Sequence, residues 1–332
     1  MEKPPSPVRA LGLCSGGLDS ILSALVLKRQ GINVTWVSFE TPFFSSEKAK
    51  AASEQTGIPL IVQNITPLYL SMLRNPNMGY GKNMNPCTDC HALMFQLAGE
   101  MMKKEGYHFL FSGEVAGQRP MSQRKSALRY VEKHSGMDGF IVRPLSAKIL
   151  PETMVEKEGL VDRGQLLDLS GRSRKPQMAL AGEWGVTGYP SPAGGCLLTD
   201  AGFSRRLRDL FDHEETIQES DLNLLKYGRH IRLSPQVKVI VGRNQAENKI
   251  LEGLVDRTRQ AIFSPSSFSG PRVILAGTLS DMAITKAAAI CVGYSKVPPG
   301  EKGAVAAIAP GKTTLLSTFG TRPDELKPFI IC

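Results

Sequence analysis

A short polar turn between two apolar segments is the stretch of this chain best suited to bind an anion. It reads Ser-Gly-Gly-x-Asp-Ser, from Ser15 to Ser20. Residues 8–13 predict a strand before it, and residues 21–30 place their apolar side chains on one helical face after it. Glycines at a helix N-terminus bring the backbone close to a ligand, and the free N–H groups and helix dipole there favour an anion. We therefore predict a phosphate site formed by Ser15, Gly16, Gly17, Asp19 and Ser20.

The carboxylate of Asp19 suits either a Mg2+ ion or the orientation of a reacting group, and the sequence does not separate these roles. Two other phosphate-binding motifs are not supported. The Gly-x-Gly-x-x-Gly pattern of dinucleotide-binding folds is absent from this turn. The segment Pro310-Gly311-Lys312-Thr313 resembles the end of a Walker loop, but Ala306 stands where that loop requires a glycine. We expect an ordinary turn there.

Three of the six cysteines lie in segments that favour chemistry over packing. Cys87 and Cys90 form a Cys-x-x-Cys pair between the loop 74–86 and a predicted helix that extends to about Glu105. A helix N-terminus lowers the pKa of a thiol, and two sulfurs at this spacing reach one centre, for metal or redox chemistry. Cys196 follows Pro-Ala-Gly-Gly, a constrained backbone that is unusual for a packing cysteine.

The remaining cysteines, Cys14, Cys291 and Cys332, are expected to be buried or to have no role. A closed zinc site is not favoured, because the sequence has neither a second Cys-x-x-Cys nor a His-x3-His pair. Six cysteines in 332 residues do not indicate a disulfide scaffold either.

Strands and helices alternate around these motifs. Helices, the first of them over residues 47–56, separate four further predicted strands at residues 33–39, 59–65, 108–114 and 140–146. This alternation predicts a doubly wound α/β domain with a mostly parallel sheet, followed by a smaller mixed α/β basic domain. Ligands of such sheets bind at the carboxyl ends of the strands, so we also place Gly113, where the apolar run of the fourth strand stops, at the nucleotide site.

Two polar segments follow the fourth and fifth strands. Residues 118–124, rich in Gln, Arg and Ser, suit a base edge or a phosphate, and equally a solvated surface. The second, Gly171-Arg172-Ser173-Arg174-Lys175, precedes a predicted helix, and the sequence assigns it no role.

The formal net charge of +9 is concentrated in the last third of the chain. Residues 222–332 contain 15 Lys and Arg against 7 Asp and Glu, whereas the rest contains 25 against 24. This asymmetry favours an appended module that binds a polyanion. We therefore predict a catalytic domain over residues 1–205, with its cysteine segments at 74–91 and 188–200, a linker over 206–221 and a basic domain over 222–332.

Neither a membrane-spanning apolar segment nor a hydrophobic signal region is present in the sequence, so we expect a cytoplasmic protein without a membrane partner. The oligomeric state is left open.

The Ser15–Ser20 turn, the Asn85-Pro86-Cys87-x-x-Cys90 pair and the distant Cys196 together resemble the PP-loop tRNA thiolases. This family includes the ThiI-like 4-thiouridine synthases and the 2-thiouridine synthases, and the resemblance covers about residues 8–205. It implies that ATP, with Mg2+, adenylates a uridine carbonyl oxygen in tRNA and that a sulfur nucleophile then displaces AMP. It favours 4-thiouridine as the product and requires a sulfur donor, either sulfide or a persulfide carrier.

In this family, members with a Cys-x-x-Cys pair and a third distant cysteine hold a [4Fe-4S] cluster by three thiolates, and the fourth iron carries sulfide. The resemblance therefore implies that Cys87, Cys90 and Cys196 are cluster ligands. A rival within the class needs only two thiols, one carrying a persulfide and the other resolving it as a disulfide.

Residues 222–332 resemble the NFACT-R RNA-binding domain through Leu225-Lys226-Tyr227-Gly228-Arg229-His230 and Val241-Gly242-Arg243-Asn244. Bacterial 4-thiouridine synthases carry an N-terminal THUMP module instead, for which we find no segment here. We therefore expect the basic domain to bind tRNA phosphates, through the side chains of Lys226, Arg229, Arg232 and Arg243. The alternative for these arginines is ion pairing with Glu247, Glu252 or Asp256.

Two other classes of function compete with tRNA thiolation. One is a PP-loop synthase that acts on a small molecule, with structural zinc at the three cysteines and an oligomerising C-terminal domain. The other is a non-catalytic RNA-binding protein with an inactive nucleotide site. The intact Ser15–Ser20 turn argues against the second class.

Overall fold

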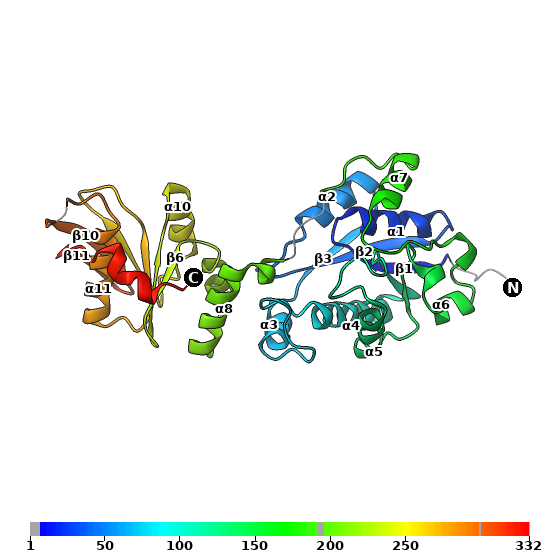
Figure 1. Cartoon of the computed structure of the whole chain (residues 1–332), viewed down its shortest axis with the longest axis horizontal. Helices are drawn as coiled ribbons and strands as arrows, with labels where there is room; N and C mark the ends of the chain where they lie inside the picture. Colours follow the sequence, from blue (N-terminus) through cyan, green and yellow to red (C-terminus); the bar gives the residue numbers. More distant parts are fainter. Residues whose placement is uncertain (1–6, 192–195, 299, 332) are drawn as a thin grey trace. The chain divides into compact units, whose positions relative to one another are not determined.

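The computed structural model describes residues 7–191, 196–298 and 300–331. The chain divides into two compact units, Met1–Thr199 and Asp200–Cys332 (Figure 1). Within the described residues, no helix is both long and apolar enough to cross a bilayer.

A parallel sheet of five strands forms the centre of the first unit. Its strands lie in the order β3-β2-β1-β4-β5, and each neighbouring pair is parallel. Their bounds are β1 (Arg9–Leu13), β2 (Asn33–Glu40), β3 (Leu60–Asn64), β4 (Phe109–Ser112) and β5 (Ile141–Val142). From β1 the chain adds β2 and β3 on one side, and then β4 and β5 on the other side, so the order in which strands are added reverses between β1 and β4. Their carboxyl ends therefore border the crevice in which ligands of such sheets bind.

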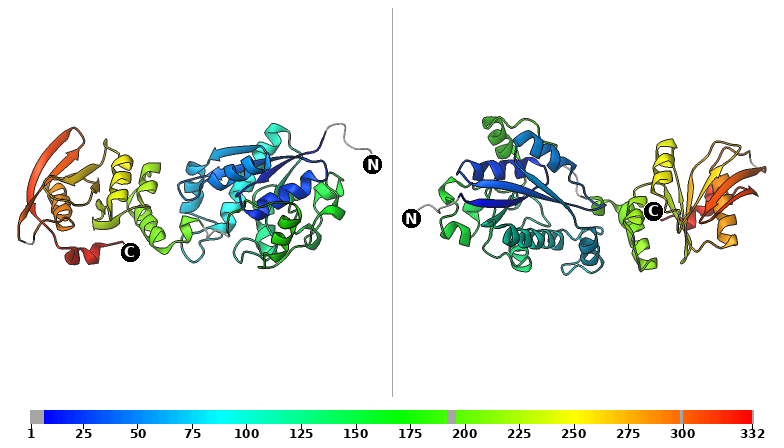
Figure 2. Two further views of the ribbon diagram at one scale, coloured as in Figure 1. Left: turned by 90° about the horizontal axis from the view of Figure 1, so that it is seen from above. Right: turned by 180° about the vertical axis from the view of Figure 1, so that it is seen from behind.

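Helices cover both faces of this sheet. Figures 1 and 2 show α1, α2 and α7 on one face and α4 and α5 on the other, with α3 beside α4. The first group is α1 (Leu18–Lys28), α2 (Glu47–Thr56) and α7 (Lys175–Glu183), and the second is α3 (Thr66–Arg74), α4 (Cys87–Glu105) and α5 (Lys125–His134). α2 and α4 both end at a glycine in the left-handed conformation, Gly57 and Gly106. The predicted doubly wound α/β class is confirmed.

The fifth strand is shorter than predicted. Only Ile141 and Val142 pair with β4, because the carbonyls of Pro144 and Leu145 instead accept hydrogen bonds from Leu167 and Leu169, at 2.9 and 2.8 Å. The intervening chain forms only short helices, at Ala147–Ile149, Met154–Lys157 (α6) and Arg163–Gln165.

The second unit is built on a six-stranded antiparallel sheet in the order β11-β10-β8-β9-β7-β6. Alternate residues point to opposite faces. Val239 and Val241 pack with α11, whereas Ile240 packs with residues of α9 and α10. The strands are β6 (Arg229–Ser234), β7 (Val237–Val241), β8 (Ala261–Pro265), β9 (Val273–Gly277), β10 (Lys302–Ala309) and β11 (Lys312–Phe319). The helices are α8 (Ala201–His213), α9 (Glu219–Leu224), α10 (Gln245–Leu254) and α11 (Asp281–Gly293), followed by a 3-10 helix at Pro323–Phe329.

Residues 206–221, which we expected to form a linker, belong to this second unit. Most of them lie in α8 and α9, and Asp209 of α8 forms ion pairs with Arg232 and Lys238 of the sheet. The Walker-like segment is the turn of a hairpin. Pro310 and Gly311 connect β10 to β11, and Gly311 has a positive φ of 68°, a conformation that favours glycine after proline in a tight turn.

Candidate active site

The Ser15–Ser20 turn lies at the carboxyl end of β1 and opens α1. Gly16 requires glycine twice over, since its φ is 69° and an added Cβ would lie 2.1 Å from the backbone of Lys48. Gly17 is the N-cap of α1 and has no side-chain cap. The hydroxyl of Ser20 accepts from the backbone N–H of Ser15 at 3.3 Å and lies 3.1 Å from its hydroxyl. These contacts hold the turn against the first residues of α1.

Gly113 lies where β4 meets this helix. A Cβ at Gly113 would lie 2.4 Å from the backbone carbonyl of Asp19, so glycine is needed for the close approach of two chain segments. The structure thus places Gly113 beside the predicted nucleotide site and gives it a packing role there.

Asp19 is the carboxylate of the site. One of its oxygens, Oδ2, accepts a hydrogen bond from Nε2 of Gln118 at 3.0 Å. The other, Oδ1, is buried and has no hydrogen-bond partner among the described residues. Burial raises the pKa of Asp19, and the Gln118 hydrogen bond and the Arg174 charge oppose this rise only in part. A carboxylate with a free buried oxygen is suited to a cation or to an incoming donor.

The cysteine pair reaches the same edge of the sheet. α4 leads into β4 and therefore runs opposite to the strands, so its first turn lies at their carboxyl ends. Cys87 is the first residue of α4, and the Asn85 amide donates to its sulfur at 3.3 Å. The third cysteine segment is tied to the cysteine loop by a 2.7 Å hydrogen bond from Asn83 to the carbonyl of Thr199.

Tyr69 lies near the three thiols, and no local pattern in the sequence marks it. Its buried ring carries a hydroxyl whose pKa is raised well above the ordinary value by burial and by the nearby Cys90, Cys196 and Cys87. Burial also raises the pKa of the Cys90 thiol to about 12, with the Tyr69 hydrogen bond opposing it. All three cysteines are unpaired thiols in one neighbourhood.

These thiols meet only part of the requirement for a metal cluster. Their chemistry and proximity suit iron. However, no three His, Cys, Asp or Glu side chains in the described part of the chain are arranged to hold a metal ion. The residues 192–195 that precede Cys196 lie outside the described ranges, and so does Cys332. Cys14 and Cys291 are buried as expected, and burial raises the pKa of each thiol to about 12.

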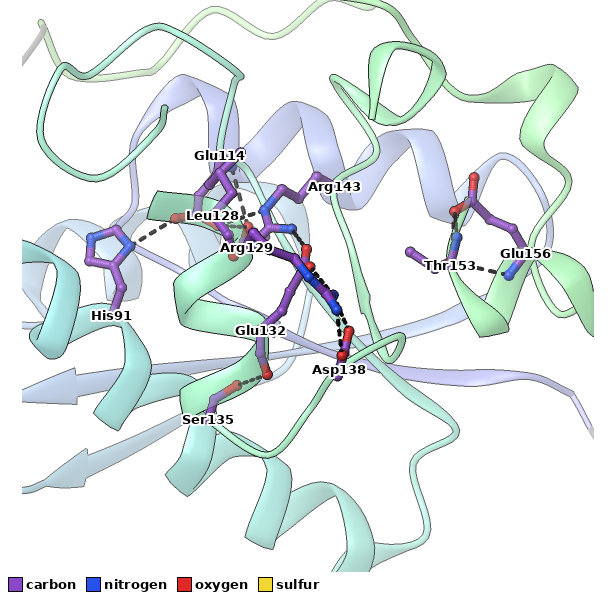
Figure 3. Close-up of polar contacts among 11 residues, drawn as sticks. His91, Glu114, Leu128, Arg129, Glu132, Ser135, Asp138, Arg143, Thr153 and Glu156 are labelled. Atoms are coloured by element: carbon purple, nitrogen blue, oxygen red, sulfur yellow. Dashed lines mark hydrogen bonds and ion pairs between the residues drawn. The ribbon is translucent and has the colours of Figure 1, made fainter. Parts of the chain in front are cut away.

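A buried ionic network, which the sequence did not predict, joins the cysteine helix to the residues that follow β4 and β5 (Figure 3). Nδ1 of His91 lies 2.8 Å from Oε1 of Glu114, and Nε of Arg143 donates to Oε2 at 2.9 Å. Burial would raise the pKa of Glu114, but Arg143 and His91 outweigh it and hold the pKa at about 2. His91 follows Cys90 directly in α4, so this network begins at the residue after the cysteine pair.

The four candidate phosphate ligands of the second unit differ in how exposed their side chains are and in which residues they already bond. Arg232 is largely buried, with 12% of its side chain exposed, and makes two hydrogen bonds to Asp209, at 2.9 and 2.7 Å. Arg243 pairs with Glu247, as our alternative for these arginines foresaw, but leaves 47% of its side chain exposed. Lys226 donates to Asn223 at 2.8 Å, and Arg229 is an exposed side chain over the ring of Tyr294. Arg232 is therefore used in an ion pair within the unit, whereas Arg229 and Arg243 keep largely exposed side chains.

Two family models match the chain, one in each unit. Residues 6–149 match "Thiamine biosynthesis protein (ThiI)", and residues 228–327 match "NFACT protein RNA binding domain". The predicted resemblance to these two domain families is confirmed.

Curated relatives match part of the chain. A tRNA-specific 2-thiouridylase MnmA of Coxiella burnetii is 30% identical over an alignment of 149 residues that covers 40% of this chain and 41% of the relative. A probable tRNA sulfurtransferase of Lactobacillus gasseri is 29% identical over 119 residues, 33% of this chain and 28% of the relative. The chain thus spans about two fifths or less of the length of these relatives. Among solved structures, a 4-thiouridine synthetase–RNA complex with bound ATP aligns with a TM-score of 0.34 at 21% identity, covering 41% of this chain and 36% of that one.

Proposed function

We propose that this chain, which combines a ThiI-family domain with an NFACT-type RNA-binding domain, is an ATP-dependent tRNA uridine thiolase. The observation that carries the proposal is that two candidate functional segments lie at the same edge of the parallel sheet. The Ser15–Ser20 turn and the first turn of α4, with Cys87 and Cys90, both lie at the carboxyl ends of the parallel strands. A phosphate site and free thiols at one edge suit a reaction that activates an atom with ATP and then replaces it with sulfur. The names of both curated relatives refer to tRNA and sulfur transfer.

The first step is adenylation of uridine. A uracil carbonyl carbon is a poor electrophile, because the ring amide is stabilised by resonance. Attack of the carbonyl oxygen on the α-phosphate of ATP releases pyrophosphate and converts that oxygen into part of a leaving group. The N–H groups of the Ser15–Ser20 turn stabilise the phosphate charge, and Asp19 is the residue to hold Mg2+, which would neutralise charge on the departing pyrophosphate.

The second step replaces the activated oxygen. A sulfur nucleophile attacks the carbon, and AMP leaves with the former uridine oxygen. The thiols of Cys87, Cys90 and Cys196 are the residues that would hold a [4Fe-4S] cluster, which when bound would supply the sulfur. All three thiols lie near Tyr69, whose pKa they raise after burial, and this common neighbourhood supports a common role. Sulfide or a persulfide carrier would be the sulfur donor.

The second unit provides the means of holding tRNA. Lys226, Arg229 and Arg243 are the side chains proposed to contact its phosphates, which positions the substrate without selecting the base. We place the protein in the cytoplasm, where tRNA and ATP are available.

Nucleoside mass spectrometry of tRNA from a deletion strain tests the proposal. Loss of 4-thiouridine, restored by the wild-type gene, is the expected result, because the matching family model is that of ThiI. Loss of 2-thiouridine instead would support the same reaction but place it at C2 of the base and not at C4. Unchanged levels of every thiolated nucleoside would contradict the proposal.

A further inference from the structure

Unpaired buried polar atoms are concentrated next to the Ser15–Ser20 turn. Five of the eleven such side-chain atoms in the described residues belong to four side chains there. They are Oδ1 of Asp19, Oε1 of Gln118, Nε of Arg174, and both Nε2 and Oε1 of Gln177. Proteins leave few buried polar atoms without a partner, because each one costs stability. A group of five indicates a ligand that completes them.

The fold brings these side chains together from three segments. Gln118 follows β4 and hydrogen-bonds to Asp19 in the first turn of α1. The N–H of Gly171 donates to the carbonyl of Ala116 at 2.9 Å, which lays the start of the Gly171–Lys175 segment beside that loop.

α7 then packs beside α1 on the same face of the sheet (Figure 1). Arg174 is its N-cap, and Gln177, in its first turn, is 1% exposed. Both side chains lie near Asp19: burial raises the pKa of its carboxyl, and the Arg174 charge and the nearby Gln177 amide oppose that rise in part. They therefore face the nucleotide side of α1.

The unpaired atoms divide into two chemical kinds. Asp19, Gln118 and Gln177 offer oxygen acceptors, which are the ligands that Mg2+ or its bound waters prefer. Arg174 and Gln177 offer N–H donors, which suit phosphate oxygens. The N-terminus of α7 has neither a side-chain cap nor an acidic residue in its first turn, so its dipole also favours an anion. A cation and a polyanion bound together match both kinds.

We infer that the N-terminus of α7 is the second half of the nucleotide site, where Arg174 and Gln177 bind the β- and γ-phosphates of ATP opposite the Ser15–Ser20 turn. The inference rests on the proposed use of ATP and assigns the part of the site that holds the leaving pyrophosphate. Arg174 thereby neutralises the charge that develops when the α-phosphate is attacked. This assignment gives a role to the Gly171–Lys175 motif.

The test compares two arginines of that motif by direct binding to the full chain. Arg174→Ala should weaken ATP with Mg2+, and pyrophosphate, by roughly tenfold to a hundredfold, because a charge-assisted hydrogen bond is lost. AMP, which lacks these phosphates, should change less than about twofold. Arg172→Ala is the matched control, since Arg172 is exposed two residues earlier, and it should leave all three affinities unchanged. Equal effects of the two variants, or a wild type that binds neither ATP nor pyrophosphate, would overturn the inference.

A second variant separates ligand binding from structural support. Gln177→Met removes two unpaired polar atoms at similar volume, so the ligand-free protein should keep or raise its melting temperature while ATP binding weakens by about three- to tenfold. A lower melting temperature with unchanged ATP affinity would show that Gln177 supports the fold and would contradict the inference. These readouts contain no tRNA. Failure of thiolation with the expected binding losses would therefore reject the proposed function and retain the phosphate site.

Discussion

Two carboxylates, one in each unit, illustrate how differently the units use buried charge. Asp19 in the first unit keeps one buried oxygen unpaired, and burial raises its pKa. Asp209 in the second unit is bonded by Arg232 and Lys238, which overcome burial and bring its pKa to about 2. The first arrangement leaves a group ready for a ligand, whereas the second satisfies the group within the fold. A domain's net charge therefore overstates the number of cations free for RNA.

The comparison predicts its largest effect at Asp19. Asp19→Asn should reduce pyrophosphate release by roughly a hundredfold or more, because the charge that serves the leaving group is lost. Its melting temperature should stay near that of the wild type, since the affected oxygen has no protein partner to lose. Pyrophosphate release and thermal unfolding measure the two effects. Normal thiolation by this variant would remove Asp19 from the mechanism.

The next effect concerns iron. Protein purified without oxygen should contain about four irons per chain. Replacing Cys87, Cys90 or Cys196 by Ala should each abolish iron binding and thiolation, whereas Cys291→Ala should retain both. Metal analysis and the visible spectrum measure this. An active preparation with stoichiometric zinc and no iron would refute the cluster, and activity that needs only two of the three thiols would favour the persulfide route.

In the second unit, substitution of a buried ion-pair residue is expected to lower the stability of the fold. Arg232→Ala should lower the free energy of unfolding by about 3 kcal/mol, because it leaves Asp209 buried with a weakened partner set. Arg322→Ala is the control, since Arg322 is 85% exposed and its pair with Glu325 is screened by solvent. Chemical denaturation measures the difference. A stable Arg232→Ala variant that binds tRNA more weakly would return Arg232 to the phosphate ligands.

The same ion pair predicts a pH dependence with a definite sign. The pKa of Asp209 is lowered from 3.8 to about 2 on folding, so its ionised form stabilises the protein above about pH 4. This contribution, about 2 kcal/mol, should disappear as the pH falls from 4 to 2. Asp209→Asn should therefore be less stable than the wild type at pH 7, and the difference should shrink below pH 4. A difference that is constant with pH would contradict this account of Asp209.

The smallest effects are expected at the exposed cations. Arg229→Ala should weaken tRNA binding only a few-fold and for all tRNAs alike, and should reduce the salt dependence by about one ion per lost contact. Melting temperature should not change. Binding titrations at several salt concentrations test this, and an unchanged salt slope would remove Arg229 from the interface.

The sequence predicted the elements well where local signals were strong. Helix 47–56 matches α2, because Gly57 ends it. Prediction from the sequence failed where two interacting residues come from distant segments of the chain. The Asp209–Arg232 pair joins residues 23 positions apart and turned an expected linker into part of a domain. Nothing local marks Tyr69 as the neighbour of three cysteines, and the role of Arg174 depends on α7 packing beside α1.

The fate of one oxygen atom tests the central claim most directly. A tRNA carrying oxygen-18 at the target uridine carbonyl would be incubated under anaerobic conditions with the full chain, ATP, Mg2+ and sulfide. Adenylation of that carbonyl predicts AMP that contains oxygen-18 in its phosphate, in equal amount to the thiouridine formed. AMP without the label, alongside thiouridine or pyrophosphate, would show that ATP activates another atom and would contradict the account.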